Sequence, residues 1–518
     1  MSSNTKTIAK NTGWFGLENI VNAVLTMLTS IAIARYLGPS KNGYIVYVSY
    51  IASVVAGLGG VGIPATTRKY MAEFVGMGDW GTARYIYLRT LLLQAGLATL
   101  ATGGLLIWVL GNANSEYKLA AALLVLSIWP SMVNFISAMA NAATEKMSAN
   151  VPASIASTFT YFVMIAATVV LHWGVVGVGA SMLFMRLVDF LVRFFPTLKR
   201  VSAWETTHVS PAGLGKRMMT FASQSVASMV VAQIVWGRSE VILLKMLSTD
   251  IRQVAFYSAA FSMAEQLLMG ATIFGAAAST TIFAQYGRDK SRLPAITASS
   301  FRYLALTTIP LHFIAASLAV PALLLLYGHQ YEGAAAVVAL APLMCMFKAF
   351  ISPAQSLLQS AERQGYVIAG TVLAGVVDIG VAWFLIPAHG AVGACIGNGA
   401  AQAVAVGTMW AVAIYLYKVK LPWMQITKIT FISALAALTA HFIAAQFAPL
   451  WGILLGGTAS LIVLFGLFYL MRVLEPEDHD RLNTLAGLLP KSVAKPANLI
   501  LSLLIRPNLT SVTEDTLS

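Results

Sequence analysis

The sequence predicts an all-α membrane protein with about 14 transmembrane helices, built as two parallel-repeat six-helix lobes followed by two C-terminal helices. Three observations predict this fold. The chain contains a series of long apolar runs, its positive charges fall in alternate gaps between them, and a weak repeat relates its two halves. The runs predict the helices, the charges predict their direction, and the repeat predicts their grouping.

The apolar runs are long enough to cross a bilayer as helices. Each has about 20 residues or more, which span about 30 Å of hydrocarbon. Membrane β-strands need only about 10 residues and alternate in polarity. Charged residues make up 10% of the chain, against about 25% in soluble domains. The predicted spans are residues 14–34, 44–64, 87–110, 118–141, 151–171, 174–198, 218–244, 254–283, 303–327, 333–357, 365–386, 391–417, 423–447 and 450–471.

The distribution of Lys and Arg predicts how the chain is oriented. With the N-terminus in the cytoplasm, 24 of the 33 Lys and Arg residues fall on the cytoplasmic side, five on the outer side and four within helices. This asymmetry follows the positive-inside rule and predicts that both termini are cytoplasmic. The net charge of +13 would also suit a nucleic-acid binder, but no long basic stretch or nucleic-acid module occurs.

An internal repeat predicts the domains. Residues 44–72 and 256–284 both link a tyrosine-bearing helix start to a basic cytoplasmic loop, and residues 174–179 (GVVGVG) parallel residues 390–395 (GAVGAC). The repeat covers six spans, so both copies run in the same direction. The predicted domains are an N-terminal lobe (1–200), a C-terminal lobe (201–420), two added helices (421–474) and a cytoplasmic tail (475–518).

Motifs of common enzymes are missing from the sequence. It contains no Walker A motif, His-Glu-x-x-His pair or Gly-x-Ser-x-Gly elbow. We therefore expect neither an enzyme nor a cofactor or metal. One G-x-G-x-x-G match, residues 57–62, lies inside the second span and is expected to bend that span or allow close helix contact. Two G-x-x-x-G pairs, starting at Gly393 and Gly452, are expected to pack helices, and Cys345 and Cys395 to be buried without a disulfide.

Several charges lie within the predicted spans, where each costs about 2.5–3.5 kcal/mol on insertion scales. Arg186, Asp189 and Arg193 share one helical face in the sixth span. One interpretation is an internal salt bridge, and the other leaves one guanidinium free to bind an anion. Polar stripes on the first, eighth and tenth spans favour a hydrated lumen over interhelical hydrogen bonds alone.

Three motifs resemble those of polysaccharide flippases (Wzx-like) of the multidrug/oligosaccharidyl-lipid/polysaccharide (MOP) exporter superfamily. With the fourteen spans, the resemblance covers nearly the whole chain. The matching segments are residues 34–39 (ARYLGP) with 43–44 (GY), residues 68–73 (RKYMAE) with 78–79 (GD), and residues 385–387 (LIP) with Gly390 and 393–394 (GA).

The resemblance implies two lobes forming a V around a central cavity, in a bacterial inner-membrane protein. The implied function is to carry an undecaprenyl-diphosphate-linked oligosaccharide to the periplasmic leaflet for exopolysaccharide, O-antigen or capsule synthesis. The implied partners are this glycan, membrane lipids, H⁺ or Na⁺, and a polymerase or other glycan-assembly proteins. Three alternatives remain open: a peptidoglycan-precursor flippase, a cation-coupled multidrug antiporter, and a non-transporting assembly scaffold.

The family's cavity is lined mainly by helices one, two, seven and eight, which would place Glu18, Arg238 and Glu265 near it. We expect embedded bases and amides to contact the substrate, and embedded acids to carry a coupling proton or Na⁺. The expected substrate contacts are Arg238, Lys348, Arg186, Asn22 and Gln355. The expected ion-coupling residues are Glu18, Glu265 and Asp378.

Overall fold

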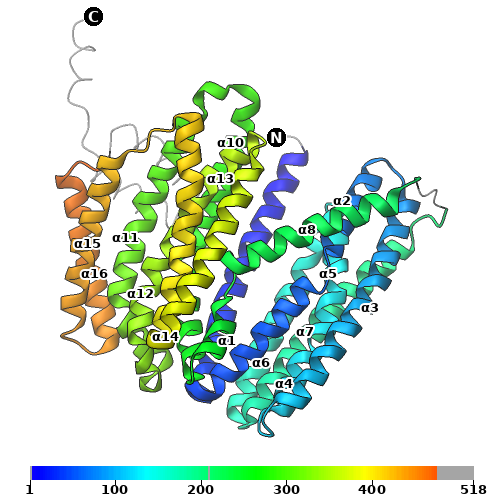
Figure 1. The fold of residues 1–518 in the computed structure, drawn as a ribbon, viewed down its shortest axis with the longest axis horizontal. Coiled ribbons are helices and arrows are strands. Elements are labelled where there is room, and N and C mark those ends of the chain that lie inside the picture. The colour runs from blue at the N-terminus through cyan, green and yellow to red at the C-terminus, as the bar shows by residue number, and fades with distance from the viewer. Residues whose placement is uncertain (1–2, 208–210, 475–518) are drawn as a thin grey trace, which may run out of the picture. The chain divides into compact units, whose positions relative to one another are not determined.

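The computed structural model describes residues 3–207 and 211–474, without the side chains of residues 3–20, 227–228, 231–232 and 234. Within these ranges the regular elements are all helices (Figure 1). The α-helices are α1 (Ser3–Leu58), α2 (Ile63–Gly76), α3 (Trp80–Asn112), α4 (Lys118–Leu126), α5 (Ile128–Ala143), α6 (Val151–Val170), α7 (Gly174–Ser202), α8 (Leu214–Trp236), α9 (Glu240–Leu247), α10 (Arg252–Arg288), α11 (Leu293–Tyr327), α12 (Ala335–Cys345), α13 (Ile351–Ser360), α14 (Gln364–Tyr417), α15 (Trp423–Ala444) and α16 (Pro449–Leu470). The short 3₁₀ helices are η1 (Met147–Asn150), η2 (Lys290–Arg292), η3 (His329–Ala334) and η4 (Met346–Phe350).

The helices of the described residues are compatible with fourteen membrane crossings. Eleven segments are long and apolar enough to span a bilayer. Two of them, the segments containing α1 and α14, are each divided by a glycine with non-helical backbone angles. Helices α8 and α9 cover most of the predicted span 218–244, which is not among these eleven segments. The prediction of an all-helical, polytopic membrane protein is confirmed.

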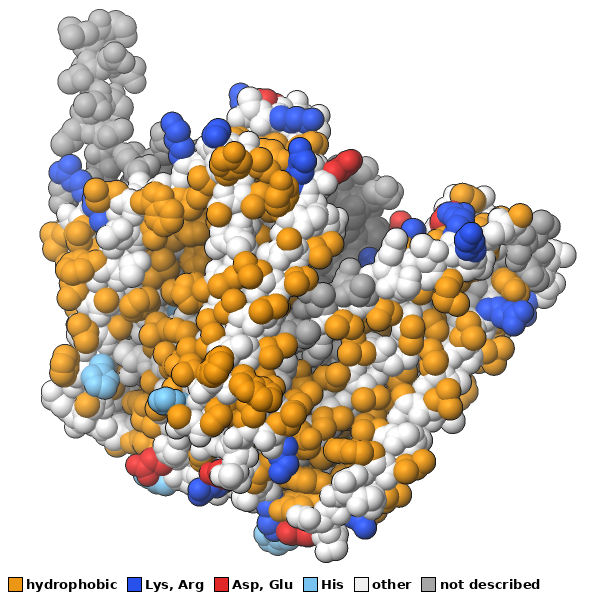
Figure 2. Space-filling view, in the orientation of Figure 1, with side chains coloured by type: hydrophobic (Ala, Val, Ile, Leu, Met, Phe, Trp, Pro, Cys, Tyr) orange, Lys and Arg blue, Asp and Glu red, His pale blue; other side chains and the backbone are white. Residues whose placement is uncertain are grey.

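The surface of the helices is apolar where a bilayer would contact it. On α3, Leu92, Leu100 and Ile107 are 70%, 73% and 76% exposed. In Figure 2, hydrophobic side chains cover the middle of the visible helices, and Lys and Arg gather toward the helix ends. Such exposure would be unfavourable in water and is expected for side chains that face lipid.

Two glycines separate spans that would otherwise form one continuous helix. Gly38 (φ 70°) divides α1 just before Pro39, and Gly390 (φ 52°) divides α14 three residues after Pro387. Side-chain-bearing L residues rarely adopt a positive φ. Gly174, which matches Gly390 in the repeat, also has a positive φ of 60° and begins α7. The matched segments therefore both start at a glycine with a positive φ, each directly after a helix.

The glycine-rich segment 57–62 breaks the second span, as predicted. Helix α1 ends at Leu58, and α2 begins at Ile63 after a turn. Gly62 has φ 71°, and a Cβ at this position would clash with the backbone of Ala222 in α8. The segment thus bends the span and brings α2 close to α8.

The expectations for the two G-x-x-x-G pairs and the cysteines are also confirmed. A Cβ on Gly393 would lie 2.6 Å from the backbone of Leu385, and one on Gly456 would lie 2.8 Å from the carbonyl oxygen of Ala440. Glycine therefore allows close packing within the α14 and α15–α16 hairpins. Cys345 and Cys395 are buried and free.

The chain forms two compact units. Unit 1 comprises residues 1–262, 326–334 and 371–401, and unit 2 comprises residues 263–325, 335–370 and 402–518. The predicted lobes followed chain order, whereas these units interleave segments. The division into lobes at residue 200 stays a prediction, as does the cytoplasmic tail 475–518, which lies outside the described residues.

Hydrogen bonds explain why distant segments join unit 1. The Asn42 amide donates to the Tyr331 hydroxyl at 2.8 Å. The Gln330 amide donates to the carbonyl oxygen of Arg35 at 2.7 Å. Both bonds fasten η3 to α1 beside its break at Gly38.

Candidate functional site

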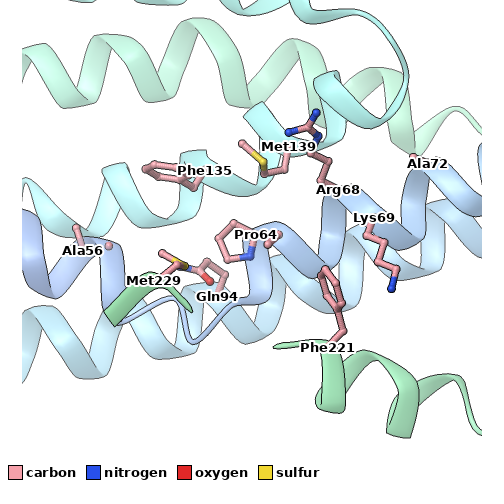
Figure 3. A pocket seen from close by; sticks show the side chains of 12 residues that line it. Ala56, Pro64, Arg68, Lys69, Ala72, Gln94, Phe135, Met139, Phe221 and Met229 are labelled. Carbon is pink, nitrogen blue, oxygen red and sulfur yellow. The ribbon is translucent and has the colours of Figure 1, made fainter. Parts of the chain in front are cut away.

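Unit 1 contains an apolar pocket beside the break between α1 and α2. It has a volume of about 520 Å³, within the range of small-molecule sites. Figure 3 shows aromatic and thioether side chains on its walls and two basic side chains from α2. The lining residues are Ala56, Gly57, Pro64, Ala65, Arg68, Lys69, Ala72, Gln94, Phe135, Met139, Phe221 and Met229.

The Gln94 amide oxygen is a buried acceptor in this pocket that the described residues leave unsatisfied. Gln94 is 1% exposed, and its Oε1 atom has no hydrogen-bond partner among the described residues. A buried polar atom without a partner is costly, by about 1–3 kcal/mol. A ligand or water that donates a hydrogen bond to this amide would remove that cost.

A cationic pocket adjoins the apolar one and shares Lys69 and Phe221 with it. It also has a volume of about 520 Å³. The Nζ atom of Lys69 lies 4.0 Å from the centroid of the Phe221 ring, a distance suited to a cation–π contact. The lining residues are Lys69, Tyr70, Ala212, Gly213, Lys216, Arg217, Thr220, Phe221 and Gln224.

Most of the basic side chains in the two pockets form no ion pair with a described residue. Arg217 pairs with Glu73 at 3.1 Å. Within the described part of the chain, Arg68, Lys69 and Lys216 have no ion pair. An apolar pocket joined to an unneutralised basic one matches a ligand with a hydrocarbon chain and an anionic head.

A second polar cluster in unit 1 surrounds two carboxylates. Glu240 and Asp378 are both 0% exposed and lie close enough to interact electrostatically. The Tyr257 hydroxyl and the Asn398 amide donate to Glu240 at 2.8 and 2.7 Å. The Ser239 hydroxyl donates to Asp378 Oδ2 at 3.1 Å.

No described base neutralises this cluster. In the described ranges, neither carboxylate forms an ion pair with Lys or Arg. Asp378 Oδ1 is buried and accepts no hydrogen bond from a described residue. Two adjacent buried carboxylates cannot both remain charged alone, so the cluster suits a proton or a small hard cation.

The expected substrate contacts are dispersed. Arg238 lies between α8 and α9, where it donates to the Ser258 hydroxyl at 3.4 Å and stacks 4.7 Å from the centre of the Phe261 ring. Lys348 lies in η4 of unit 2, and its Nζ is 3.8 Å from the Glu265 carboxylate. Predicted for different roles, Lys348 and Glu265 are thus brought together.

The charged stripe of the sixth span is partly an internal ion pair. Arg193 pairs with Asp189 at 2.7 Å, and the Asn134 amide donates to the same carboxylate. Arg186 is half-buried on α7 and makes no hydrogen bond or ion pair with a described residue. The salt-bridge interpretation therefore holds for Arg193. The Arg186 guanidinium has no ion-pair partner among the described residues.

The remaining expected residues give no common site. The Asn22 amide donates to the Ser154 hydroxyl at 2.8 Å, which joins α1 to α6. Gln355 is half-buried on α13. The side chain of Glu18 lies outside the described residues.

Sequence reasoning missed Arg68, Lys69 and Gln94 as site residues, and it missed the partners of Asp378. Arg68 and Lys69 belong to the RKYMAE motif, which supported the family resemblance but did not indicate a binding site. Glu240 was visible as an embedded acid, but nothing in the sequence joins it to a residue 138 positions later.

Known proteins show similarity at the level of family and fold. A family described as polysaccharide biosynthesis protein matches residues 32–336. No curated protein sequence matches the chain significantly. The structure resembles the lipid II flippase MurJ in an inward closed conformation, with TM-score 0.69 and 14% identity over 88% of this chain and 98% of MurJ.

Two multidrug resistance MATE family transporters of the MOP superfamily are also similar. The inward-facing one has TM-score 0.64 and 15% identity over 77% of this chain and 95% of its own. The outward-facing one has TM-score 0.55 and 16% identity over 80% and 94%. These similarities show a shared fold.

Proposed function

The chain belongs to the family of polysaccharide biosynthesis proteins, and we propose that it is a flippase for an undecaprenyl-diphosphate-linked oligosaccharide. It carries this unit from the cytoplasmic to the periplasmic leaflet of a bacterial inner membrane, for exopolysaccharide, O-antigen or capsule synthesis. The joined apolar and cationic pockets of unit 1 are the observation that carries the proposal.

The chemistry of the two pockets fits the two parts of such a lipid. Phe135, Met139 and Met229 offer apolar surface to a polyprenyl chain. Lys69 and Lys216 offer ammonium groups to a diphosphate. Transfer of an unshielded charge into hydrocarbon costs tens of kcal/mol in the idealised limit. Basic side chains that replace the lost water lower that barrier.

The carboxylate cluster supplies a candidate site for the coupling ion. The sequence contains no Walker A motif, so we assign the driving force to a proton or Na⁺ gradient. All the ligating atoms that Glu240, Asp378 and Ser239 offer are oxygens, which suit Na⁺ and H⁺ alike. Asp378 keeps the ion-coupling role predicted for it, with Glu240 as its partner.

The Lys348–Glu265 pair gives unit 2 an exchangeable basic group. At 3.8 Å and with side chains 29% and 35% exposed, this pair is weak. A substrate phosphate competes with the Glu265 carboxylate for Lys348. Lys348 then pairs with the phosphate in place of the carboxylate. Arg238 and Arg186 remain proposed anion contacts.

Alternating access requires contacts that separate and form again. We assign this role to the bonds that fasten η3 to the α1 break, Asn42 to Tyr331 and Gln330 to Arg35. Each is a single hydrogen bond, worth about 1 kcal/mol net, so they can separate during transport.

A vesicle assay tests the proposal. The purified protein is reconstituted with a fluorescent undecaprenyl-diphosphate oligosaccharide, and the fraction that reaches the opposite leaflet is measured with an impermeant quencher. Replacing both Lys69 and Lys216 with Gln should raise the KM for transport about tenfold per lost charged contact. Lys199→Gln, an exposed lysine of α7 outside both pockets, should transport normally.

Three results would contradict the proposal. Movement no faster than in protein-free vesicles would favour a scaffold. Transport of a peptidoglycan precursor or of cationic drugs, but not of the oligosaccharide lipid, would favour the corresponding alternative. Unchanged kinetics in the double variant would remove the pockets from the substrate path.

A further inference from the structure

A third cavity of unit 1 lies beside the break at Gly38. It has a volume of about 450 Å³ and is enclosed by the second half of α1, the end of α3, the residues before α4, and α9. Neither the family match nor the proposed flippase path accounts for it. The lining residues are Ser40, Tyr44, Tyr47, Val48, Trp108, Val109, Asn112, Ala113, Asn114, Tyr117, Lys245 and Ile251.

Four aromatic side chains converge on this cavity. The rings of Tyr44 and Tyr117 are tilted, with centroids 4.4 Å apart. Trp108 remains 43% exposed at the cavity wall. Tyr and Trp are common in the belts at membrane interfaces. Here, however, they come from three separate segments and surround one hollow together with polar groups, which a lipid-facing belt does not require.

The polar atoms of the cavity are available for hydrogen bonds. The hydroxyls of Tyr44 and Tyr47 have no partner among the described residues. The Asn112 amide nitrogen donates to the Trp108 carbonyl oxygen at 2.9 Å, which leaves the amide oxygen as an acceptor. Asn114 and Ser40 add exposed polar side chains. Hydroxyls and amides offer both donors and acceptors, as an array of sugar hydroxyls requires.

Charged residues next in sequence to the lining residues are paired with one another, whereas the lining residue Lys245 is not paired with a described residue. Lys41 pairs with Glu116 at 3.0 Å, and Arg252 pairs with Asp250 at 2.9 Å. Partial burial raises the pKa of Asp250, but the hydrogen bonds and charge of Arg252 outweigh it and lower that pKa below its usual value. Lys245 is exposed and has no ion pair with a described residue. Its positive charge therefore sets the sign of the cavity.

We infer that this cavity binds an acidic oligosaccharide, with sugar rings stacked on Trp108 and the tyrosines and a carboxylate at Lys245. Sugar rings present C–H groups to aromatic faces and hydroxyls at their edges, which matches walls that are both aromatic and amide-bearing. The inference rests on the proposed function for the source of the ligand, which is the glycan part of the transported lipid.

Binding of free oligosaccharides to the full-length protein tests the inference. Tetragalacturonate and the neutral maltotetraose are titrated by calorimetry into the protein in detergent. Tetragalacturonate should bind saturably and more tightly than maltotetraose. Trp108→Ala should weaken binding about tenfold or more. Trp129→Ala, which removes an exposed tryptophan of α5 outside the cavity, should leave it unchanged.

A second pair of variants tests the charge. Lys245→Gln should abolish the preference for the acidic probe, and Lys245→Arg should retain it. Absence of saturable binding, equal affinity in Trp108→Ala, or an unchanged preference in Lys245→Gln would each overturn the inference. So would an effect of the Trp108 variant on copurifying phospholipid alone, since that would make the cavity a lipid site.

The two proposals fail separately. If the protein binds tetragalacturonate at Trp108 but moves no lipid-linked glycan in vesicles, the flippase proposal fails and the cavity assignment stands. If the vesicle assay succeeds and the Trp108 variant binds saccharides normally, the cavity assignment fails and the flippase proposal stands.

Discussion

At the scale of single residues, the buried carboxyl groups of Glu240 and Asp378 have the greatest need of hydrogen-bond or ionic partners. Tyr257 and Asn398 donate hydrogen bonds to Glu240, but one oxygen of Asp378 accepts no hydrogen bond from a described residue. The described donors therefore satisfy only part of the cluster, which leaves an oxygen available to the proposed proton or cation. The sequence placed Asp378 among the ion-coupling residues because a charge inside a span is expensive. It could not reveal the neighbouring Glu240, since pairing between distant spans depends on tertiary packing.

Replacing Asp378 with Asn should remove the effect of the coupling ion on stability. If Na⁺ is the ion, it should stabilise the wild-type protein by about 2.7 kcal/mol at 100 times its Kd, and the variant by much less. Thermal unfolding in NaCl and in choline chloride at equal ionic strength measures this difference. Glu116→Gln, an exposed carboxylate, serves as the control. Equal stabilisation of the Asp378 variant by Na⁺ would place the ion elsewhere.

At the scale of elements, glycines with positive φ decide where one span ends and the next begins. Gly390 divides α14, and the Gln253 side chain occupies the space where its Cβ would be. The same Gln253 accepts a hydrogen bond from the backbone of Ala391 at 2.9 Å. Backbone conformation and a side-chain contact thus fix this turn together.

Gly390→Ala should destabilise the protein by at least about 1–2 kcal/mol. A positive φ is unfavourable for alanine, and the added Cβ would displace the Gln253 side chain. Gly380→Ala in the same helix is the matched control, since nothing lies within 4 Å of its added Cβ. The control should be neutral or stabilising by up to about 1 kcal/mol. Thermal unfolding of both variants in one detergent makes the comparison. Equal melting temperatures for both would contradict this explanation of the turn.

The elements were predictable to different degrees for physical reasons. The length of an apolar run reflects the thickness of the bilayer, so the all-helical, polytopic fold was predictable from the sequence. The bend at residues 57–62 was predictable from its glycines. The pockets were not, because they form where α2, α5 and α8 meet and involve ordinary residues such as Gln94 and Phe135. Packing partners of this kind leave no periodic signal.

At the scale of the whole molecule, the asymmetry of positive charge predicts one orientation. Of the 33 Lys and Arg residues, 24 fall on the side assigned to the cytoplasm. The positive-inside rule concerns insertion, so the orientation is tested in the cell rather than from the fold. The two native cysteines are buried, which makes introduced cysteines usable as reporters.

Ser115→Cys and Met147→Cys should react differently with a membrane-impermeant maleimide. Both positions are exposed and lie in consecutive gaps between spans. The cysteine at 115 should be labelled in intact spheroplasts, and the one at 147 only after permeabilisation. The reverse pattern would invert the orientation, and labelling of both in intact spheroplasts would indicate a miscounted span.

The wall that Lys69 and Phe221 share has a practical consequence for handling the protein. At this wall the apolar pocket meets the cationic one. A surfactant with one hydrocarbon tail and a negative group next to it should therefore compete with the proposed lipid for the two pockets. Sulfate- and sarcosine-headed surfactants have this form, whereas maltoside surfactants have an uncharged sugar head group. If the proposed lipid binds in these pockets, purification in maltosides should retain it, and exchange into an anionic surfactant should release it for identification by mass spectrometry.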